Sequence, residues 1–321
     1  MDAIKTTGLT KYYGKARGII DLNLCVPEGE FFGFIGPNGA GKSTTMNIMT
    51  GCLAATSGEV KIGGYDIFEE AQEAKKLIGY LPEQPPLYLD RTPQEYLTFV
   101  ARAKGIPEKE IKTQVQSVME QTQTLDVAHR LMKNLSKGYK QRVGIAQALL
   151  GNPEVIILDE PTVGLDPRQI IEIRDLIQEL GKNHTVILSS HILSEVQAVC
   201  QTILIISKGK LVACDSPENL ERLFAGTTTV ELVTEAEETE IPGILANLPY
   251  ITDLEIKSGG ENRRRVRIDT DREADDEICR DIFFAFADSR KAITQMSMAS
   301  MSLEDIFIEL TGAEKKEDEA Q

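Results

Sequence analysis

Short apolar runs alternate with longer segments of helical periodicity through the first two-thirds of the chain. Uninterrupted apolar residues at 31–35 and 155–158 are typical of strands buried on both faces. The pattern predicts an amphipathic helix at 167–180 and further short strands at 4–9, 19–26, 58–62, 77–81, 185–189, 202–207 and 210–214. This alternation predicts an α/β fold with a largely parallel sheet, in which the first two strands form an antiparallel flank.

One long segment interrupts the alternation. Residues 92–150 have helical periodicity without strand patterning. The start of this segment is well marked, because Thr92 can cap a helix and Pro93 suits the first helical position. Glu95 can complete a capping box with Thr92. We therefore expect a helical subdomain, inserted over about residues 85–150.

The last third of the chain has a different rhythm. Strands are expected at 228–234, 251–257, 264–268 and 293–298, with helices at 241–248, 273–287 and 303–310. The first six of these elements follow the β-α-β-β-α-β order of the ferredoxin-like arrangement. With Gly226 as the boundary, we predict a first domain over 1–224, a small α+β domain over 226–311 and a charged tail over 312–321.

Composition narrows the possible partners and the compartment. The 321 residues carry a net charge of −15, and most of the excess acid follows residue 224, so no basic surface is expected for nucleic acid or an anionic membrane. The five cysteines are scattered, as is typical of thiols in a reducing compartment. The N-terminus lacks a signal pattern, and no apolar run is long enough to span a bilayer. We expect a cytoplasmic protein whose partner supplies any membrane part.

The strongest chemical motif is a glycine-rich loop between the strand at 31–35 and a helix that begins near Lys42. The glycines let consecutive N–H groups face phosphate oxygens, and the helix directs the positive end of its dipole to the same place. Lys42 can reach the β- and γ-phosphates, and the Ser43 hydroxyl can bind Mg²⁺. We therefore predict a P-loop that binds a nucleoside triphosphate and consists of Gly36, Pro37, Asn38, Gly39, Ala40, Gly41, Lys42, Ser43 and Thr44.

Two further features suggest groups that act on this triphosphate. The strand at 155–158 runs into Asp159 and Glu160, and a buried parallel strand delivers such acids to the edge of the sheet where ligands bind. One carboxylate can hold Mg²⁺, and the next can polarise an attacking water. Tyr12 and Tyr13 lie between the first two predicted strands, where each is either a base-stacking residue or an ordinary surface or core aromatic.

Taken together, these motifs resemble the ATP-binding subunits of ATP-binding-cassette (ABC) transporters over residues 4–223. The segment LSKGYKQR at 135–142 is similar to the LSGGQ signature of that family, although Lys137 replaces a glycine and Tyr139 replaces the glutamine. Ser136 and Gly138 are retained at the start of a helix, and the resemblance implies that they bind a γ-phosphate.

The resemblance also implies roles for other positions. Gln84 would sense Mg²⁺ and the attacking water, and His191 would contact the γ-phosphate. Tyr13 is favoured over Tyr12 as the residue that stacks on adenine, and the D-loop of the family would include Asp166. The implied cofactors are ATP and Mg²⁺, with metal contacts from Ser43, Gln84 and Asp159. The implied catalytic residues are Lys42, Gln84, Glu160 and His191.

The same resemblance implies an assembly. In a head-to-tail dimer, the P-loop of one cassette and the signature of the other would enclose each ATP, so that ATP binding closes the dimer and hydrolysis opens it. A chain with one cassette would form a homodimer or pair with a sister ATPase. An integral-membrane permease would hold it at the inner face of the cell membrane and contact it at residues 85–91.

The signature segment and the sequence SLEDIF at 302–307 resemble the ABC-2-type exporter group, which includes multidrug, sodium-efflux and gliding-motility-associated ATPases. The alternative is a non-transport ABC ATPase that acts in DNA repair or on ribosomes. A single cassette, an acidic C-terminal part and the lack of coiled-coil or zinc-module patterns favour the transporter subunit, without a nucleic-acid partner. An importer subunit remains possible, but its longer regulatory barrel fits the last domain poorly. We expect that domain to be a dimerisation or packing module.

Overall fold

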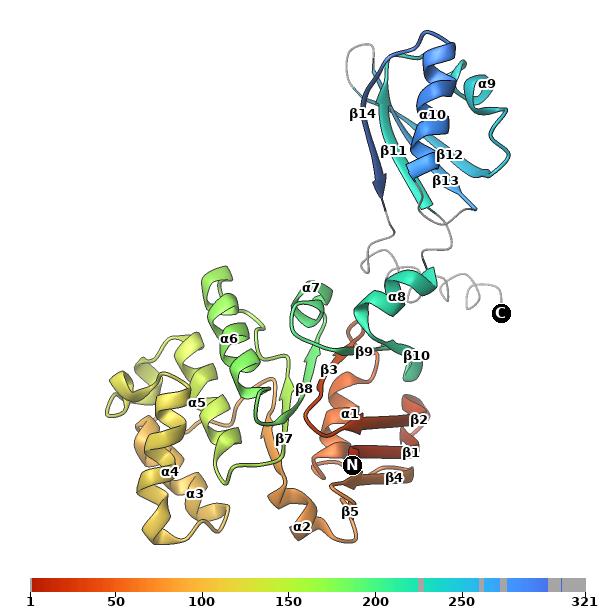
Figure 1. The fold of residues 1–321 in the computed structure, drawn as a ribbon. Helices are drawn as coiled ribbons and strands as arrows, with labels where there is room; N and C mark the ends of the chain where they lie inside the picture. The colour runs from red at the N-terminus through yellow and green to blue at the C-terminus, as the bar shows by residue number, and fades with distance from the viewer. Residues whose placement is uncertain (1, 225–227, 260–262, 272–275, 300–306, 308–321) are drawn as a thin grey trace. The chain divides into compact units, whose positions relative to one another are not determined.

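The computed structural model describes residues 2–224, 228–259, 263–271, 276–299 and 307 (Figure 1). The chain falls into two compact units, Met1–Ser216 and Pro217–Gln321, which are treated separately below.

The larger unit is built on a six-stranded sheet with the order β10-β9-β3-β8-β7-β6. All its strand pairs are parallel except the hairpin between β9 and β10. Every residue of β3, β7 and β8 is buried, which explains the apolar runs at 31–35, 155–158 and 186–188. The predicted parallel sheet is therefore confirmed, with strands β3 (Phe31–Ile35), β6 (Ile78–Leu81), β7 (Val155–Asp159), β8 (Thr185–Ser190), β9 (Thr202–Ser207) and β10 (Lys210–Asp215).

A second, antiparallel sheet has the order β2-β1-β4-β5. It contains β1 (Asp2–Tyr13), β2 (Ala16–Pro27), β4 (Ser57–Ile62) and β5 (Tyr65–Asp66). The expectation that Tyr12 and Tyr13 lie between strands is wrong, because the β1–β2 ladder continues to the pairs Tyr12–Arg17 and Tyr13–Ala16. The core cluster joins both sheets to helix α1 (Lys42–Met49), with Leu22 and Ile62 from one sheet, Phe34 and Ile157 from the other, and Met46 from the helix.

Between β6 and β7 the chain forms the helical subdomain that the sequence predicts (Figure 1). The capping box of α3 is present, because Glu95 donates its backbone N–H to the Thr92 hydroxyl and its carboxylate accepts the Thr92 N–H. The subdomain contains α3 (Pro93–Ala103), α4 (Glu108–Gln121) and α5 (Lys137–Leu149), with 3₁₀ turns at Leu125–Val127 and Met132–Asn134. The other helices of the larger unit, besides α1, are α2 (Ala71–Lys76), α6 (Pro167–Leu180) and α7 (Leu193–Gln197).

The smaller unit contains a four-stranded antiparallel sheet with the order β12-β13-β11-β14. Its core packs Val230, Val266 and Ile268 of the sheet against Ile282 and Phe286 of α10. After α8 (Pro217–Phe224), the elements follow the predicted β-α-β-β-α-β order as β11 (Thr228–Thr234), α9 (Ile241–Leu245), β12 (Ile251–Ser258), β13 (Arg264–Thr270), α10 (Asp276–Asp288) and β14 (Ile293–Ala299).

Some sequence predictions fall outside the described residues. These are the boundary at Gly226, the tail at 312–321 and, apart from Phe307, the helix at 303–310. Within the described ranges, no helix combines the length and apolar character needed to cross a membrane.

Candidate functional site

The site lies at one edge of the parallel sheet, where the strand order β3-β8-β7 brings three loops together. The P-loop follows β3, Glu160 follows β7 and His191 follows β8. A cavity of about 440 Å³ opens here, and the P-loop lines it with Asn38, Gly39, Gly41, Lys42, Ser43 and Thr44. The other predicted residues in its lining are Tyr13, Glu160 and His191.

The P-loop needs glycine at two positions for different reasons. At Gly36 a side chain has no room, because a Cβ atom there would lie 2.4 Å from the carbonyl oxygen of Ile206 on β9. Gly41 has a φ of 112°, which side-chain-bearing residues rarely adopt, and it forms the N-cap of α1. The first turn of α1 contains no acidic residue, so its positive dipole end and its N–H groups are available to an anion.

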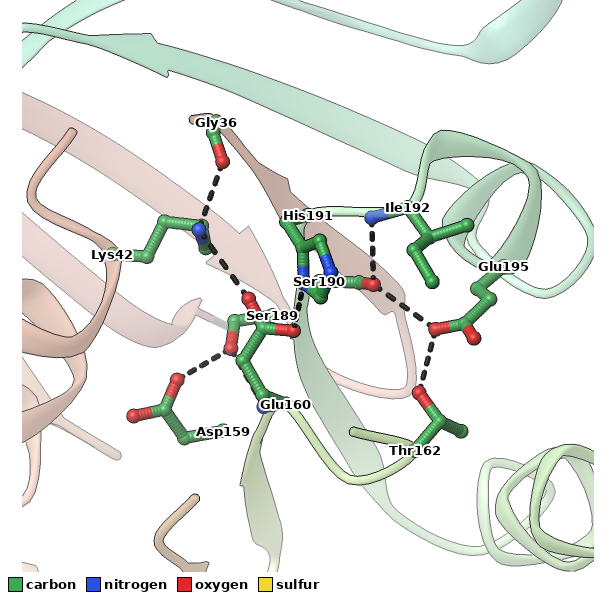
Figure 2. Close-up of polar contacts among 10 residues, drawn as sticks. All are labelled: Gly36, Lys42, Asp159, Glu160, Thr162, Ser189, Ser190, His191, Ile192 and Glu195. Atoms are coloured by element: carbon green, nitrogen blue, oxygen red, sulfur yellow. Dashed lines mark hydrogen bonds and ion pairs between the residues drawn. The ribbon is translucent and has the colours of Figure 1, made fainter. Parts of the chain in front are cut away.

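Lys42 is held beneath the loop by two oxygen partners (Figure 2). Its Nζ donates to the Gly36 carbonyl oxygen at 2.8 Å and lies 3.3 Å from Oε1 of Glu160. Both side chains are largely buried, with Lys42 and Glu160 each 6% exposed. Burial strengthens this ion pair relative to one in water, and it places the only P-loop cation beside the predicted water-activating carboxylate.

Glu160 has unusual backbone geometry as well as two side-chain partners. Its φ of 50° lies in the left-handed region, which costs on the order of 1–3 kcal/mol for a residue other than glycine. Its Oε2 lies 2.8 Å from Nδ1 of His191. The carboxylate is thus held between Lys42 and His191 at the end of β7, and such strained conformations are frequent at active sites.

Ser189 orients both acids, and sequence reasoning missed it. Its Oγ donates to Oδ1 of Asp159 at 2.6 Å and accepts the backbone N–H of Glu160 at 3.0 Å. Asp159 is 2% exposed and does not line the cavity, and Ser189 connects its carboxylate to the backbone of Glu160. Ser189 lies opposite Asp159 in the β7–β8 register. The one feature of the sequence that could have indicated its role is a serine near the end of the strand that pairs with β7.

Tyr12 and Tyr13, the two candidates for stacking on adenine, differ in their position relative to the P-loop cavity. Tyr13 lines the cavity, shares a 3.3 Å hydrogen bond with the Thr44 hydroxyl and has the Lys11 ammonium 5.5 Å from its ring centroid. Tyr12 is 41% exposed and does not line the cavity. Gln84 does not line it either, whereas the neighbouring Glu83 does.

The predicted signature residues lie in a different place. Ser136 is the N-cap of α5 and accepts the Tyr139 backbone N–H at 3.3 Å. A separate cavity of about 270 Å³ is lined by Ser136, Gly138 and Tyr139, and it shares no lining residue with the first. The Tyr139 hydroxyl donates to Asp126 at 2.7 Å, which raises the pKa of this phenol.

Asp166 has a local structural contact. Its Oδ1 accepts the Gln169 backbone N–H at 3.0 Å and so caps α6, and it lines neither cavity. The predicted residues therefore include one set at the P-loop cavity and another at the start of α5, whereas Gln84, Asp159 and Asp166 line neither cavity.

A third surface feature lies beside residues 85–91. A groove of about 730 Å³ is lined by aromatic residues that include Tyr88 and Phe99, whose ring centroids are 5.5 Å apart. Both are about half exposed, at 49% and 50%. Tyr96 also lines the groove but is almost completely buried, and this burial raises its pKa to about 12.

Comparisons with known proteins now give these features a family. The family model described as "ABC transporter" matches residues 19–163. The bacitracin transport ATP-binding protein BcrA of Bacillus licheniformis is 43% identical over 211 residues, which cover 65% of this chain and 68% of BcrA. The chain belongs to the ABC transporter family.

Similarity to ABC proteins extends beyond the cassette. The linearmycin resistance ATP-binding protein LnrL of Bacillus subtilis is 29% identical over 96% of this chain and 98% of LnrL. Among solved structures, a dimeric ABC cassette in a post-hydrolysis state bound to ADP and phosphate is 27% identical, with a TM-score of 0.60, and covers 66% of this chain and 98% of that one.

The family settles the class of activity. The chain is the ATP-binding subunit of an exporter-type ABC transporter, and its ATP hydrolysis is coupled to transport. The comparisons confirm the predicted P-loop NTPase fold and the resemblance to ABC-2-type exporter ATPases. They also support the interpretation as a transporter subunit over that as a non-transport ATPase. The roles of individual residues stay predictions.

Proposed function

We propose that ATP binds in the P-loop cavity and that a second cassette supplies Ser136 and Gly138 to complete each site. The observation that supports this proposal is the separation of the two cavities, since the P-loop cavity and the signature cavity share no residue. A head-to-tail pair of identical or sister chains places each set opposite the other. Because two cassettes then surround one ATP, binding closes the pair and loss of the γ-phosphate opens it.

The chemical roles follow from the contacts. The ammonium of Lys42 neutralises charge on the transferring phosphoryl group, as do the N–H groups at the start of α5. Glu160 accepts a proton from the attacking water, and the Nδ1 contact of His191 fixes the direction of that carboxylate. Tyr13 stacks on adenine, and Asp166 contributes to the interface between the cassettes.

The donor set fits Mg²⁺ as a metal held mainly by phosphate oxygens and water. No group of three or more His, Cys, Asp or Glu side chains suited to a metal occurs in the described part of the chain, and Mg²⁺ needs only one or two protein oxygens beside phosphates. Ser43 lines the P-loop cavity and would hold the ion directly, whereas Gln84 and Asp159 lie outside the lining and would hold it through water. Bound there, the ion would supply positive charge to the β- and γ-phosphates.

The transport partner is proposed to be an integral-membrane permease. Residues 85–91 and the aromatic groove beside them offer exposed ring surface to it, chiefly from Tyr88 and Phe99. The chain would then lie on the inner face of the cell membrane. The relatives are named for bacitracin transport and linearmycin resistance, so we propose an antibiotic as the exported substrate. The domain over 226–311 would stabilise the dimer.

The variant Glu160→Gln tests the proposal. We expect ATP binding to persist, hydrolysis to fall by at least about 10²-fold because the general base is lost, and an ATP-dependent dimer to accumulate. Equilibrium binding of ATP, phosphate release and the mass measured by light scattering follow these three properties. The exposed Glu28 provides the matched control, since Glu28→Gln should behave as wild type.

The position of the signature is tested in the same background. Adding Ser136→Arg to Glu160→Gln should abolish the dimer while each monomer still binds ATP at its own P-loop. Hydrolysis by Glu160→Gln at the wild-type rate would contradict the role of Glu160. A dimer that persists with Ser136→Arg would contradict the composite site.

A further inference from the structure

Glu195, on the short helix α7, connects the two loops that carry the proposed catalytic pair (Figure 2). Its Oε2 accepts a hydrogen bond from the Thr162 hydroxyl at 2.6 Å and another from the Ser190 hydroxyl at 3.0 Å. The Ser190 hydroxyl also accepts the backbone N–H of Ile192 at 3.0 Å, which closes the turn around His191. One carboxylate oxygen therefore holds both loops.

The Thr162 and Ser190 hydroxyl groups each lie close in sequence to one of the proposed catalytic residues. Thr162 is two residues after Glu160, and Ser190 directly precedes His191. The loops after β7 and β8 are thus joined twice, once by the direct contact between His191 and Glu160 and once through Glu195. Hydrogen bonds to an ionised carboxylate are stronger than those between neutral groups, so the second link restrains both loops.

Packing alone does not explain a carboxylate at this position. Oε1 of Glu195 is buried and, among the residues that the structure describes, is the one side-chain polar atom of this kind without a hydrogen-bond partner. The adjoining cavity measures only about 10 Å³, and its lining is mostly apolar, with Ile170, Ile177, Leu188 and Val199 beside Thr162 and Arg174. A buried unpaired acceptor is unfavourable, and an apolar residue would avoid it. The two hydrogen bonds of Oε2 are therefore what a carboxylate provides here that an apolar side chain would not.

We propose that Glu195 is a positioning residue for ATP hydrolysis. Through its hydrogen bonds to Thr162 and Ser190, it fixes the position of Glu160 relative to His191. The inference rests on the proposed catalytic roles of Glu160 and His191. Its physical basis is that misplacement of a catalytic group by about 1 Å can cost on the order of 10²-fold in rate. Glu195 does not line the P-loop cavity, so nucleotide binding itself should not depend on it.

The test compares Glu195→Ala with Glu195→Gln in the full chain. We expect Glu195→Ala to lower kcat by about 10- to 100-fold while KM for ATP changes by less than about twofold. Glu195→Gln should keep kcat near wild type, because the amide oxygen can still accept both hydroxyl groups. Ser194→Ala, at an exposed position on the same helix, is the matched control and should leave kcat unchanged.

A double substitution tests whether Glu195 acts through Thr162 and Ser190. Thr162→Val combined with Ser190→Ala should lower kcat as Glu195→Ala does, and adding Glu195→Ala to this pair should cause little further loss. An unchanged kcat in Glu195→Ala would overturn the inference. An equal loss in Glu195→Ala and Glu195→Gln, or a matching rise in KM, would also overturn it and leave Glu195 a structural residue.

The two proposals can fail separately. If Glu160→Gln and His191→Ala hydrolyse ATP at the wild-type rate, the proposed function fails, whatever Glu195 does. If those variants are inactive and Glu195→Ala retains its rate, only the present inference fails. Thermal unfolding of each variant shows whether it is folded under the assay conditions.

Discussion

At the scale of single residues, the geometry of the site depends on side chains that fix each other's orientation, and no single residue determines it. Ser189 illustrates this, since its hydroxyl donates to Asp159 and accepts the backbone N–H of Glu160. Asp159 is almost completely buried, so its carboxylate needs that donor. The orientation of Asp159, a predicted metal ligand, thus depends on a residue of the neighbouring strand.

Removing the Ser189 hydroxyl should therefore destabilise the larger unit. We expect Ser189→Ala to lower the free energy of unfolding by about 1.5–3 kcal/mol, the usual range for a hydrogen bond to a charged group. Urea unfolding followed by circular dichroism measures the change. In an Asp159→Ala background the same substitution should cost less, because its partner is gone. Equal costs in both backgrounds would mean that the 2.6 Å contact contributes nothing to stability.

At the scale of elements, local signals and tertiary packing decide different helices. The start of α3 is determined locally, because its threonine cap, first-position proline and third-position glutamate are all in the sequence. Helix α7 has five residues, and its N-cap residue Ile192 makes no capping bond. Its position depends on β3 instead, where Gly33 has no side chain and a Cβ atom would lie only 2.1 Å from Cγ1 of Val196.

The capping box of α3 predicts a local loss of stability. Thr92→Ala should cost about 1 kcal/mol, within the usual range for removal of a threonine cap, whereas Thr92→Ser should be close to wild type. Hydrogen exchange should show faster exchange at the Glu95 amide, which donates to the Thr92 hydroxyl. Thr98→Ala is the control, because Thr98 lies within the helix and its hydroxyl bonds back to the Gln94 carbonyl oxygen. Unchanged exchange in Thr92→Ala would show that the cap does not hold this turn.

At the scale of the whole molecule, the chain combines an ATP-binding unit with a separate small unit. Met1–Ser216 and Pro217–Gln321 each have their own core. LnrL is similar over 98% of its own length, so the small unit belongs to the region that this relative shares. The P-loop cavity and the signature cavity both lie in the larger unit.

Two cores predict two unfolding transitions. Calorimetry of the full-length Glu160→Gln variant should resolve both, and ATP with Mg²⁺ should raise the midpoint of only the larger one, because ligand stabilises only the unit that binds it. At a free ATP concentration of about 100 times Kd the gain is about 2.7 kcal/mol. One cooperative transition that shifts as a whole with ATP would contradict the independence of the units.

Much of this protein was determined by its sequence alone. The buried strands could be predicted because burial on both faces imposes uninterrupted apolar residues, as at Phe31–Ile35. The P-loop could be predicted because its chemistry requires glycines and a lysine at fixed local spacing. The bounds of α6, Pro167–Leu180, agree with prediction since its cap and its amphipathic period are local. The assignment to ABC proteins rested on several such local motifs in order.

Only the tertiary structure decided which residues from distant motifs lie together. Asp159 meets Ser189 because parallel pairing of β7 and β8 aligns residues thirty positions apart, and no local period records that register. Glu195 reaches Thr162 and Ser190 through the same pairing. The start of α5 forms a cavity that shares no residue with the P-loop cavity. Sequence specifies local conformation and local chemistry, whereas contacts between distant segments depend on strand register and packing.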